Sequence, residues 1–240
     1  MAYRAVGMTD VGLVRKENQD NFLVLAPQMV YAVADGMGGH AGGKQASAIA
    51  IEVLRQELEG ARVLPKGAVE AALSAANERI LREAKAQHLD GMGTTLVLAM
   101  YDKSLWQIVH IGDSRAYLIN KAQIKPITKD HSLVEELLAQ GSITEDEARV
   151  HPHRNILTRA LGSYEDLMPE WNEVKVRKGE YLLLCTDGLY NMLEAEEIQT
   201  LVAAPGMALE AKTKTLVEAA NKRGGLDNIT VILAAEEDGL

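Results

Sequence analysis

Short apolar runs rich in Val, Ile, Leu and Ala recur along the chain, separated by clusters of Gly, Asp, Asn and Ser. Such runs are typical of strands, because a strand needs only a few residues to cross a core while turn residues end it. Tight turns between several of them favour antiparallel pairing. The predicted strands are Phe22–Ala26, Met29–Ala34, Thr94–Tyr101, Trp106–Ile111, Ala116–Ile119, Tyr181–Thr186 and Ile229–Ala234.

Apolar side chains at helical spacing mark a second kind of element. Residues Lys44–Glu59 and Ala68–Ala86 place them three or four positions apart, which predicts two long amphipathic helices. Further helical segments are predicted over Met207–Asn221, Leu133–Ala139 and Glu145–Val150. The helices come in blocks and do not follow every strand. The pattern therefore predicts an α+β fold and not a doubly wound α/β sheet.

Composition narrows the class of protein. The chain has 240 residues, 47% of them hydrophobic, which suits one large domain covering residues 1–240. Its net charge of −9 argues against nucleic acid or an anionic membrane as a partner, because both require a positive surface. The single cysteine, Cys185, suits a reducing compartment. No signal core or membrane-spanning run is evident, so we expect a cytoplasmic protein, with monomer as the default.

Four aspartates stand at the ends of predicted strands. Asp35 and Asp187 directly follow apolar runs, whereas Asp20 and Asp227 lie just before them. If neighbouring strands are antiparallel, all four lie at one edge of the sheets. A hairpin whose loop is centred between Pro27 and Gln28 predicts that Asp20 faces Asp35 across its ends.

The clustering of these acids suggests a metal site. Taken singly, an Asp beside a Gly is ordinary turn chemistry. Several carboxylates about 4 Å apart, however, repel by roughly 1 kcal/mol per pair even in water, and a divalent cation relieves that repulsion. A set of oxygen ligands without clustered Cys or His favours Mg²⁺ or Mn²⁺ over Zn²⁺.

A glycine-rich segment follows one of the acids. In "VADGMGGHAGG", residues 33–43, five glycines occur in the eight residues after Asp35. So little side-chain bulk indicates that something approaches the backbone closely, and we interpret it as ions and a phosphate. Gly36 could then offer its backbone carbonyl to a metal.

Several motifs occur in a fixed order and together resemble one family. The sequence resembles the metal-dependent PP2C-type (PPM) Ser/Thr protein phosphatases in their compact bacterial form, over nearly the whole chain. The motifs are "RKENQD" (15–20), "VADGMGGHAGG" (33–43), "MGTT" (92–95), "HIGDSRAYL" (110–118), "KDHS" (129–132), "CTDGLYNML" (185–193) and "GGLDNITVI" (224–232).

The resemblance implies a fold and a metal centre. It implies a four-layer α-β-β-α sandwich, with two antiparallel sheets flanked by helices and a binuclear centre at one edge. In that arrangement Asp35 bridges two ions. Asp187 and Asp227 complete the protein ligands of one ion, and Asp20 with the carbonyl of Gly36 those of the other.

The resemblance also implies further roles. A third, weaker ion matches Asp113 and Asp187, and Arg15 matches the arginine that holds the substrate phosphate. His40 matches the histidine proposed as general acid, and residues 142–163 match a variable flap beside the site. The implied reaction is hydrolysis of phosphoserine or phosphothreonine in proteins by water activated between two Mn²⁺ or Mg²⁺ ions. The implied partners are phosphoproteins, with a Ser/Thr kinase and its targets among them.

Four other functions find less support in the sequence. A catalytically silent binding module of the same fold would be favoured by loss of a metal carboxylate, and none is lost. A nucleotide-binding loop would need a G-x-x-x-x-G-K-[ST] pattern, which the glycine segment lacks. A cysteine-based phosphatase would need an Arg six positions after Cys185, where the chain has Asn191. The other metallophosphatase class would need a GNHE-like motif and ligating histidines, which are missing.

The histidines outside the glycine segment have plainer expected roles. We expect His110 to be a packed strand residue. We expect His131, His151 and His153, in or near the flap, to be solvated loop residues, with contact to the substrate as the alternative.

Overall fold

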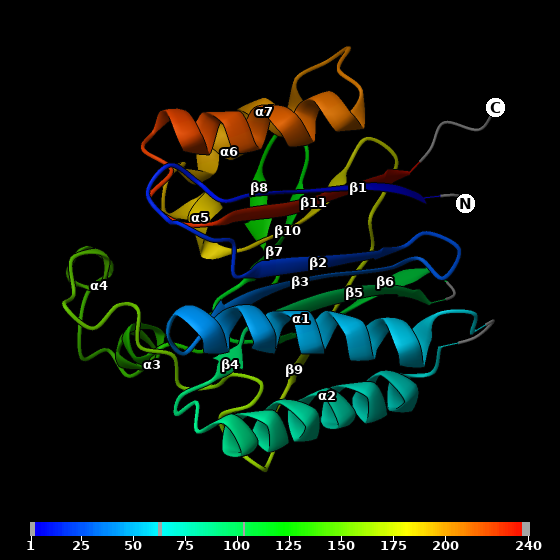
Figure 1. Ribbon diagram of the computed structural model, residues 1–240. Coiled ribbons are helices and arrows are strands. Elements are labelled where there is room, and N and C mark those ends of the chain that lie inside the picture. The colour runs from blue at the N-terminus through cyan, green and yellow to red at the C-terminus, as the bar shows by residue number, and fades with distance from the viewer. Residues whose placement is uncertain (1–2, 62–63, 103, 237–240) are drawn as a thin grey trace.

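Two antiparallel β-sheets pack face to face, and helices cover their outer faces (Figure 1). The structure is a computed structural model that describes residues 3–61, 64–102 and 104–236, without the side chains of His40 and Ala41. The four layers follow the order helices, sheet, sheet, helices. The expected α+β class and α-β-β-α sandwich are therefore confirmed.

The first sheet joins strands from both ends of the chain. Its order is β1-β11-β10-β7-β8, and every described pairing in it is antiparallel. The N-terminal strand thus lies beside the last one, so that the two ends of the sequence share one sheet. The strands are β1 (Tyr3–Asp10), β11 (Ile229–Glu236), β10 (Tyr181–Cys185), β7 (Arg115–Ile119) and β8 (Ile124–Pro126).

The second sheet is built from a hairpin and the strands that extend it. Its order is β2-β3-β5-β6-β9, and the short β4 also pairs with β3. The strands are β2 (Asp20–Leu25), β3 (Val30–Met37), β4 (Gly93–Thr94), β5 (Leu96–Asp102), β6 (Leu105–Ile111) and β9 (Glu170–Val174).

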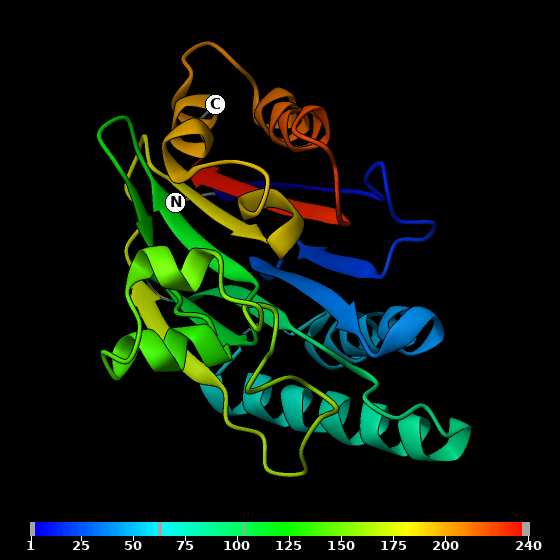
Figure 2. The same ribbon diagram turned by 90° about the vertical axis from the view of Figure 1, so that its left-hand side faces the viewer.

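The helices form two outer layers and one side group. The long helices α1 (Gly39–Leu58) and α2 (Lys66–Gln87) pack on the second sheet, while α6 (Ala195–Ala203) and α7 (Leu209–Lys222) pack on the first. The side group lies at one edge of the sandwich, in front of the sheets in Figure 2. It comprises α3 (Leu133–Ala139) and α4 (Glu145–Arg149), and the single turn α5 (Asp187–Tyr190) begins directly after β10.

Three apolar clusters hold these layers together. One lies between α1, α2 and the second sheet, one between α6, α7 and the first sheet, and one between the two sheets. The cluster between the sheets centres on Trp106, whose ring contacts those of Tyr3, Tyr31 and Tyr101 at centroid distances of 5.1–5.4 Å. The rings of Tyr3 and Tyr101 also contact each other, at 4.9 Å, so four aromatic side chains pack together where the sheets meet.

The predicted elements were mostly right, with three informative differences. Helix α1 begins at Gly39, five residues before the predicted Lys44, so part of the glycine segment is helical. The strand predicted over Thr94–Tyr101 is broken at Thr95, whose N–H turns to the carbonyl of Asp35 at 2.8 Å. The sequence did not predict strands β1, β8 and β9 or helices α5 and α6. These elements are short, or polar residues interrupt their apolar pattern.

The glycine segment packs against the chain's own backbone. A Cβ on Gly36 would lie 2.1 Å from the carbonyl oxygen of Gly43 and 2.8 Å from that of Gln19. A Cβ on Gly38, whose φ is +111°, would lie 2.3 Å from the carbonyl oxygen of Gly91. The sequence indicated that something approaches this backbone closely. In the structure the close contacts are between β3 and α1, and between this segment and the loop before β4.

Candidate metal centre

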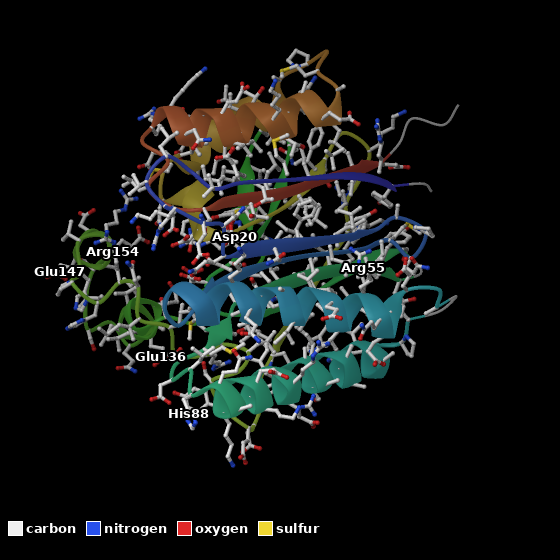
Figure 3. The ribbon with its side chains drawn as sticks, in the orientation of Figure 1. Asp20, Arg55, His88, Glu136, Glu147 and Arg154 are labelled. Atoms are coloured by element: carbon white, nitrogen blue, oxygen red, sulfur yellow. The ribbon has the colours of Figure 1, made fainter. Side chains whose placement is uncertain are left out.

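Two of the aspartates face each other across the β2–β3 hairpin. The ladder pairs Asp20 with Asp35, which confirms the predicted register. Asp20 is buried and Asp35 partly buried, and both lie at the same end of the second sheet. Figure 3 shows Asp20 on the side of the sandwich from which α3 and α4 project.

The first sheet brings two more acids to the same edge. Asp187 opens α5 two residues after the end of β10, and Asp227 lies two residues before the start of β11. The hydroxyl of Thr186 donates to Oδ2 of Asp20 at 2.8 Å and accepts the N–H of Thr230 at 3.0 Å. Since Thr186 follows a strand of the first sheet, this hydrogen bond ties the acid of one sheet to the backbone of the other.

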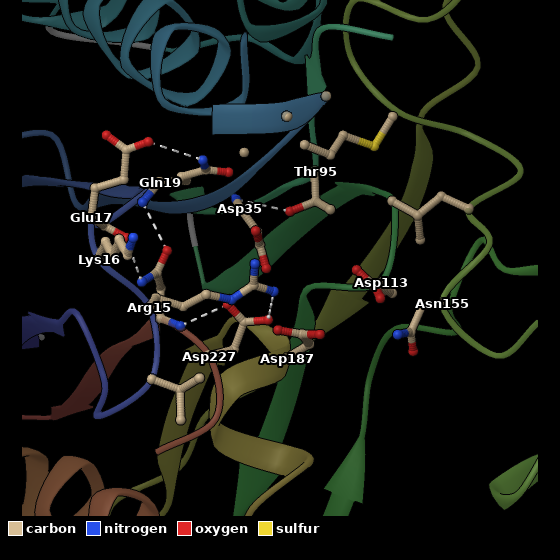
Figure 4. Close-up of a pocket in the computed structure, with 17 residues that line it drawn as sticks. Arg15, Lys16, Glu17, Gln19, Asp35, Thr95, Asp113, Asn155, Asp187 and Asp227 are labelled. Carbon is tan, nitrogen blue, oxygen red and sulfur yellow. Dashed lines mark hydrogen bonds and ion pairs between the residues drawn. The ribbon is translucent and has the colours of Figure 1, made fainter. Parts of the chain in front are cut away.

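The acids open onto one cavity of about 700 Å³ (Figure 4). Arg15 lines it as well, and its Nη2 lies 2.6 Å from Oδ2 of Asp227. Asp20 does not line the cavity itself, but it pairs across the hairpin with Asp35, which does. The lining includes Arg15, Asp35, Gly36, Asp113, Asp187 and Asp227.

The electrostatics of the cluster show mutual repulsion. Burial, followed by the charges of Asp20 and Asp187, raises the pKa of Asp35 well above its usual range. Burial raises the pKa of Asp20 to about 6. Burial together with neighbouring carboxylates raises the pKa of Asp113 and of Asp187 to about 7. Such a cluster is stable at neutral pH only when it holds protons or cations.

The donor set fits hard divalent cations. Oδ1 of Asp20 and Oδ1 of Asp187 are buried without a hydrogen-bond partner among the described residues. Buried polar atoms are normally paired, so two orphaned carboxylate oxygens indicate missing ligands. All the side-chain donors of the cluster are oxygens, the type that Mg²⁺ and Mn²⁺ prefer.

The sequence-predicted site residues are mostly brought together. Arg15, Gly36, Asp113 and the other cavity acids share one lining, and Asp20 pairs with Asp35. His40 lies in the first turn of α1, but its side chain is outside the described part of the chain. Its predicted role as an acid therefore stays a prediction.

Polar residues outside the set of acids hold the acids in place; Thr95 has no role in the sequence-based prediction, and Asn228 is predicted to orient the Asp227 carboxylate or to contact a water. The hydroxyl of Thr95 accepts the N–H of Asp35 at 3.0 Å. Asn228 accepts the N–H of Gln19 at 2.8 Å and donates to the carbonyls of Val11 and Glu17. Asn228 thus fixes the loop that carries Arg15. Both residues lie inside motifs of the family resemblance, Thr95 in "MGTT" (92–95) and Asn228 in "GGLDNITVI" (224–232).

A pair of histidines supports the loop that carries Asp113. His110 is buried, as expected, but His131 is only 6% exposed, so the prediction of a solvated loop residue was wrong. Their rings stack with centroids 4.5 Å apart, and the N–H of Gly112 donates to Nδ1 of His131 at 3.2 Å. The N–H of His131 donates to the carbonyl of Gly112 at 2.9 Å and its carbonyl accepts the N–H of Thr158 at 2.8 Å, so the residue is held between these two segments.

These histidines also come close to a carboxylate, which raises the question of a second metal site. One possible ligand atom from each of His110, His131 and Glu170 lies within 4.8 Å of the others. The N–H of Gly112, however, occupies Nδ1 of His131, so the neutral ring carries its proton on Nε2. The Arg159 guanidinium lies 3.5 Å from that nitrogen. A protonated nitrogen beside a cation is a poor metal ligand, and we interpret the cluster as structural.

Fold and site together define a class of protein: two antiparallel sheets between helices, with a carboxylate-lined cavity at one edge, are the architecture of metal-dependent phosphatases. The family model "Protein phosphatase 2C" matches residues 14–233. The chain belongs to that family, as the motifs predicted, and is an enzyme of the protein phosphatase class.

Individual relatives agree with this assignment. Protein phosphatase PhpP of Streptococcus pneumoniae is 40% identical over 241 residues, which cover 96% of this chain and 97% of that protein. The structure of the serine/threonine phosphatase Stp1 from Staphylococcus aureus superposes with a TM-score of 0.91 at 33% identity, covering 99% of this chain and 96% of the other. The catalytic domain of the phosphatase PstP in complex with two manganese ions gives 0.88 at 34% identity, covering 98% and 99%.

Proposed function

We propose that this protein hydrolyses phosphoserine and phosphothreonine in proteins, with two Mn²⁺ or Mg²⁺ ions held by its aspartates. The proposal rests chiefly on the orphaned buried oxygens of Asp20 and Asp187 in one carboxylate cluster. The relatives named serine/threonine phosphatases and the two manganese ions bound by PstP support it.

We assign the metal ligands according to the sheet from which each acid comes. Asp35, at the centre of the cluster, would contact both ions. Asp20 and the carbonyl of Gly36 would hold the ion on the hairpin side, and Asp187 with Asp227 would hold the other. The raised pKa of Asp35, caused by burial and by the carboxylates around it, supports its central position.

A third ion has a weaker case. Asp113 lines the same cavity as Asp187, and burial and the charge of Asp187 raise its pKa. We propose that these two carboxylates hold the additional ion. The N–H of Gly112, next to Asp113, donates to His131, and the hydroxyl of Ser114 on its other side hydrogen-bonds to that of Thr95 at 2.7 Å. Because Thr95 also bonds to Asp35, the position of Asp113 is tied to the hairpin as well.

Arg15 is proposed to hold the substrate phosphate. Its side chain is about half exposed, and its guanidinium reaches Asp227 across the cavity. It is thus within reach of an anion bound among the carboxylates. A guanidinium can bind two phosphate oxygens with parallel N–H groups, which the single ammonium of a lysine cannot do.

The remaining chemistry concerns water and the leaving group. Two divalent ions at this site would lower the pKa of a bound water, which could then act as the nucleophile. Their positive charge would also offset the negative charge of the phosphate. The leaving serine or threonine oxygen needs a proton, and we propose His40, in the first turn of α1, as its source. This assignment rests on the family resemblance.

The proposal extends to the location, oligomeric state and partners of the protein. The described helices include none that is both long enough and apolar enough to cross a bilayer. We propose a cytoplasmic monomer in which residues 1–240 form one catalytic domain and residues 142–163 a flap beside the cavity. Its partners would be phosphoproteins, including a Ser/Thr kinase and its targets, rather than nucleic acid or membrane.

Hydrolysis of a phosphothreonine peptide with Mn²⁺ and with EDTA tests the proposal. Asp35→Asn should nearly abolish turnover, while Asp90→Asn, at an exposed acid outside the cavity, should leave it unchanged. Activity that survives EDTA would contradict the metal mechanism. No activity with Mn²⁺ would favour the rival binding module.

A further inference from the structure

The cavity of the metal centre continues into a second hollow. This hollow, of about 1140 Å³, is lined by α3, α4 and the turn after β10. It shares four lining residues with the first cavity: Asp113, Asn155, Asp187 and Asp227. The two hollows therefore form one groove, which runs from the cavity beside Arg15, past the shared carboxylates, to α3 and α4.

Three large apolar side chains line this groove and are exposed to solvent. Val14 is 62% exposed, Val150 78% and Leu226 57%. They come from three separate segments: the loop before Arg15, the end of α4, and the loop before Asp227. Single exposed apolar residues are common, but several that line one groove indicate a binding surface.

Charge gives this groove little selectivity of its own. In the second hollow Arg149 and Arg154 stand among Glu135, Glu145 and Glu194. Arg115, also in the lining, is neutralised by two hydrogen bonds of 2.7 and 2.8 Å to Asp130. Because positive and negative groups are mixed there, the exposed apolar side chains are the feature that can distinguish one ligand from another.

We propose that the groove binds the polypeptide segment around the phosphorylated residue, and that Val14, Val150 and Leu226 contact apolar side chains flanking it. This inference rests on the proposed phosphatase function. A phosphate among the carboxylates would lie at the junction of the two hollows. An extended chain rises about 3.3 Å per residue, so the residues on either side of the phosphoresidue would enter the groove. The preferred substrates are thus phosphoproteins with apolar neighbours at the site.

Two phosphothreonine peptides of equal length and charge test this inference. One carries Leu and Val around the phosphothreonine, and the other carries Ser and Gln. With Mn²⁺ the protein should hydrolyse the apolar peptide with a kcat/KM about tenfold higher. Val14→Ser, Val150→Ser and Leu226→Ser should each reduce that preference about twofold, which corresponds to about 0.4 kcal/mol of lost contact, so that the triple variant loses nearly all of it.

Met168→Ser is the matched control. Met168 is 64% exposed but lines neither hollow, so this variant should keep the wild-type preference. The ratio between peptides is insensitive to misfolding, because a partly unfolded variant loses activity toward both peptides equally.

The outcomes separate the two proposals. Equal kcat/KM for both peptides in an active wild type would overturn the apolar preference and leave the phosphatase proposal intact. The same would follow if Met168→Ser reduced the preference as much as the groove variants do. A wild type inactive toward both peptides with Mn²⁺ would overturn the phosphatase proposal and this inference together.

Discussion

Asp20 lies directly opposite Asp35 in the β2–β3 ladder, and the Thr186 hydroxyl of the other sheet donates to Oδ2 of Asp20 at 2.8 Å. Like charges directly opposite each other destabilise a sheet. The fold therefore holds two acids together against their repulsion, at the point where its two sheets are joined. Stability and metal binding are coupled at this pair.

Replacing one acid of the pair should act in opposite directions with and without metal. In EDTA at pH 8, Asp20→Asn should raise the Tm by about 2–4 °C, the shift expected for about 1 kcal/mol in a chain of this size. The amide oxygen can still accept from Thr186, so only charge is lost. With Mn²⁺ the variant should melt below the wild type, because bound ions stabilise the folded state. A lower Tm than wild type in EDTA would contradict the repulsion. Differential scanning calorimetry measures both.

The metal-free protein should lose stability as the pH rises from 5 to 8. Burial raises the pKa of Asp20 to about 6 and, with neighbouring charges, that of Asp113 and of Asp187 to about 7, from an ordinary 3.8. The folded state thus binds more protons than the unfolded state between these values. The resulting stability is complete below pH 4 and is lost as the pH passes 6 to 7.

A buried histidine opposes this trend over part of the range. Burial lowers the pKa of His131 to about 4, so its contribution grows as the pH rises from 4 to 6.5. The three carboxylates outweigh it, and the Tm in EDTA should fall across pH 5 to 8. With Mn²⁺ the slope should reverse, since ion binding requires deprotonated carboxylates. A Tm in EDTA that rises over this range would show that the carboxylates are not raised as described.

Arg15→Ala should chiefly raise KM. Loss of a charge-assisted, two-point contact costs roughly 1.5–3 kcal/mol, which predicts a KM about 10- to 100-fold higher for a phosphothreonine peptide. Arg15→Lys should recover only part of this loss. Lys16→Ala is the control, because Lys16 lines the same cavity and carries the same charge. A normal KM for Arg15→Ala in steady-state kinetics would remove the phosphate-binding assignment.

Two substitutions of His131 distinguish the role of Nδ1 from that of Nε2. Asn places an acceptor near the position of Nδ1 and can keep the hydrogen bond from Gly112, whereas Gln extends past it. His131→Asn should therefore melt about 2–4 °C above His131→Gln, as expected for one buried hydrogen bond of about 1 kcal/mol. Equal melting temperatures would show that this bond does not hold the Asp113 loop. Thermal unfolding in EDTA excludes any contribution from bound metal.

Much of the site could be predicted because it depends on local order. The hairpin register that pairs Asp20 with Asp35 follows from their equal distance from one tight turn. Asp187 and Asp227 could be placed at the same edge because each adjoins an apolar strand. The start of α1 could not be predicted, because glycine opposes helix formation, and the close packing of Gly43 on Gly36 overrides that preference.

By itself, the sequence determined most of the strands and the long helices α1, α2 and α7, how the hairpin pairs, and which acids end at the sandwich edge, because these depend on near neighbours along the chain. Only the tertiary structure decided that Thr186 hydrogen-bonds to Asp20 and that His131 is buried beneath the Asp113 loop. It also decided that Val14, Val150 and Leu226 line one groove. These contacts join segments far apart in the chain, and the packing of the layers, not any local pattern, brings such segments together.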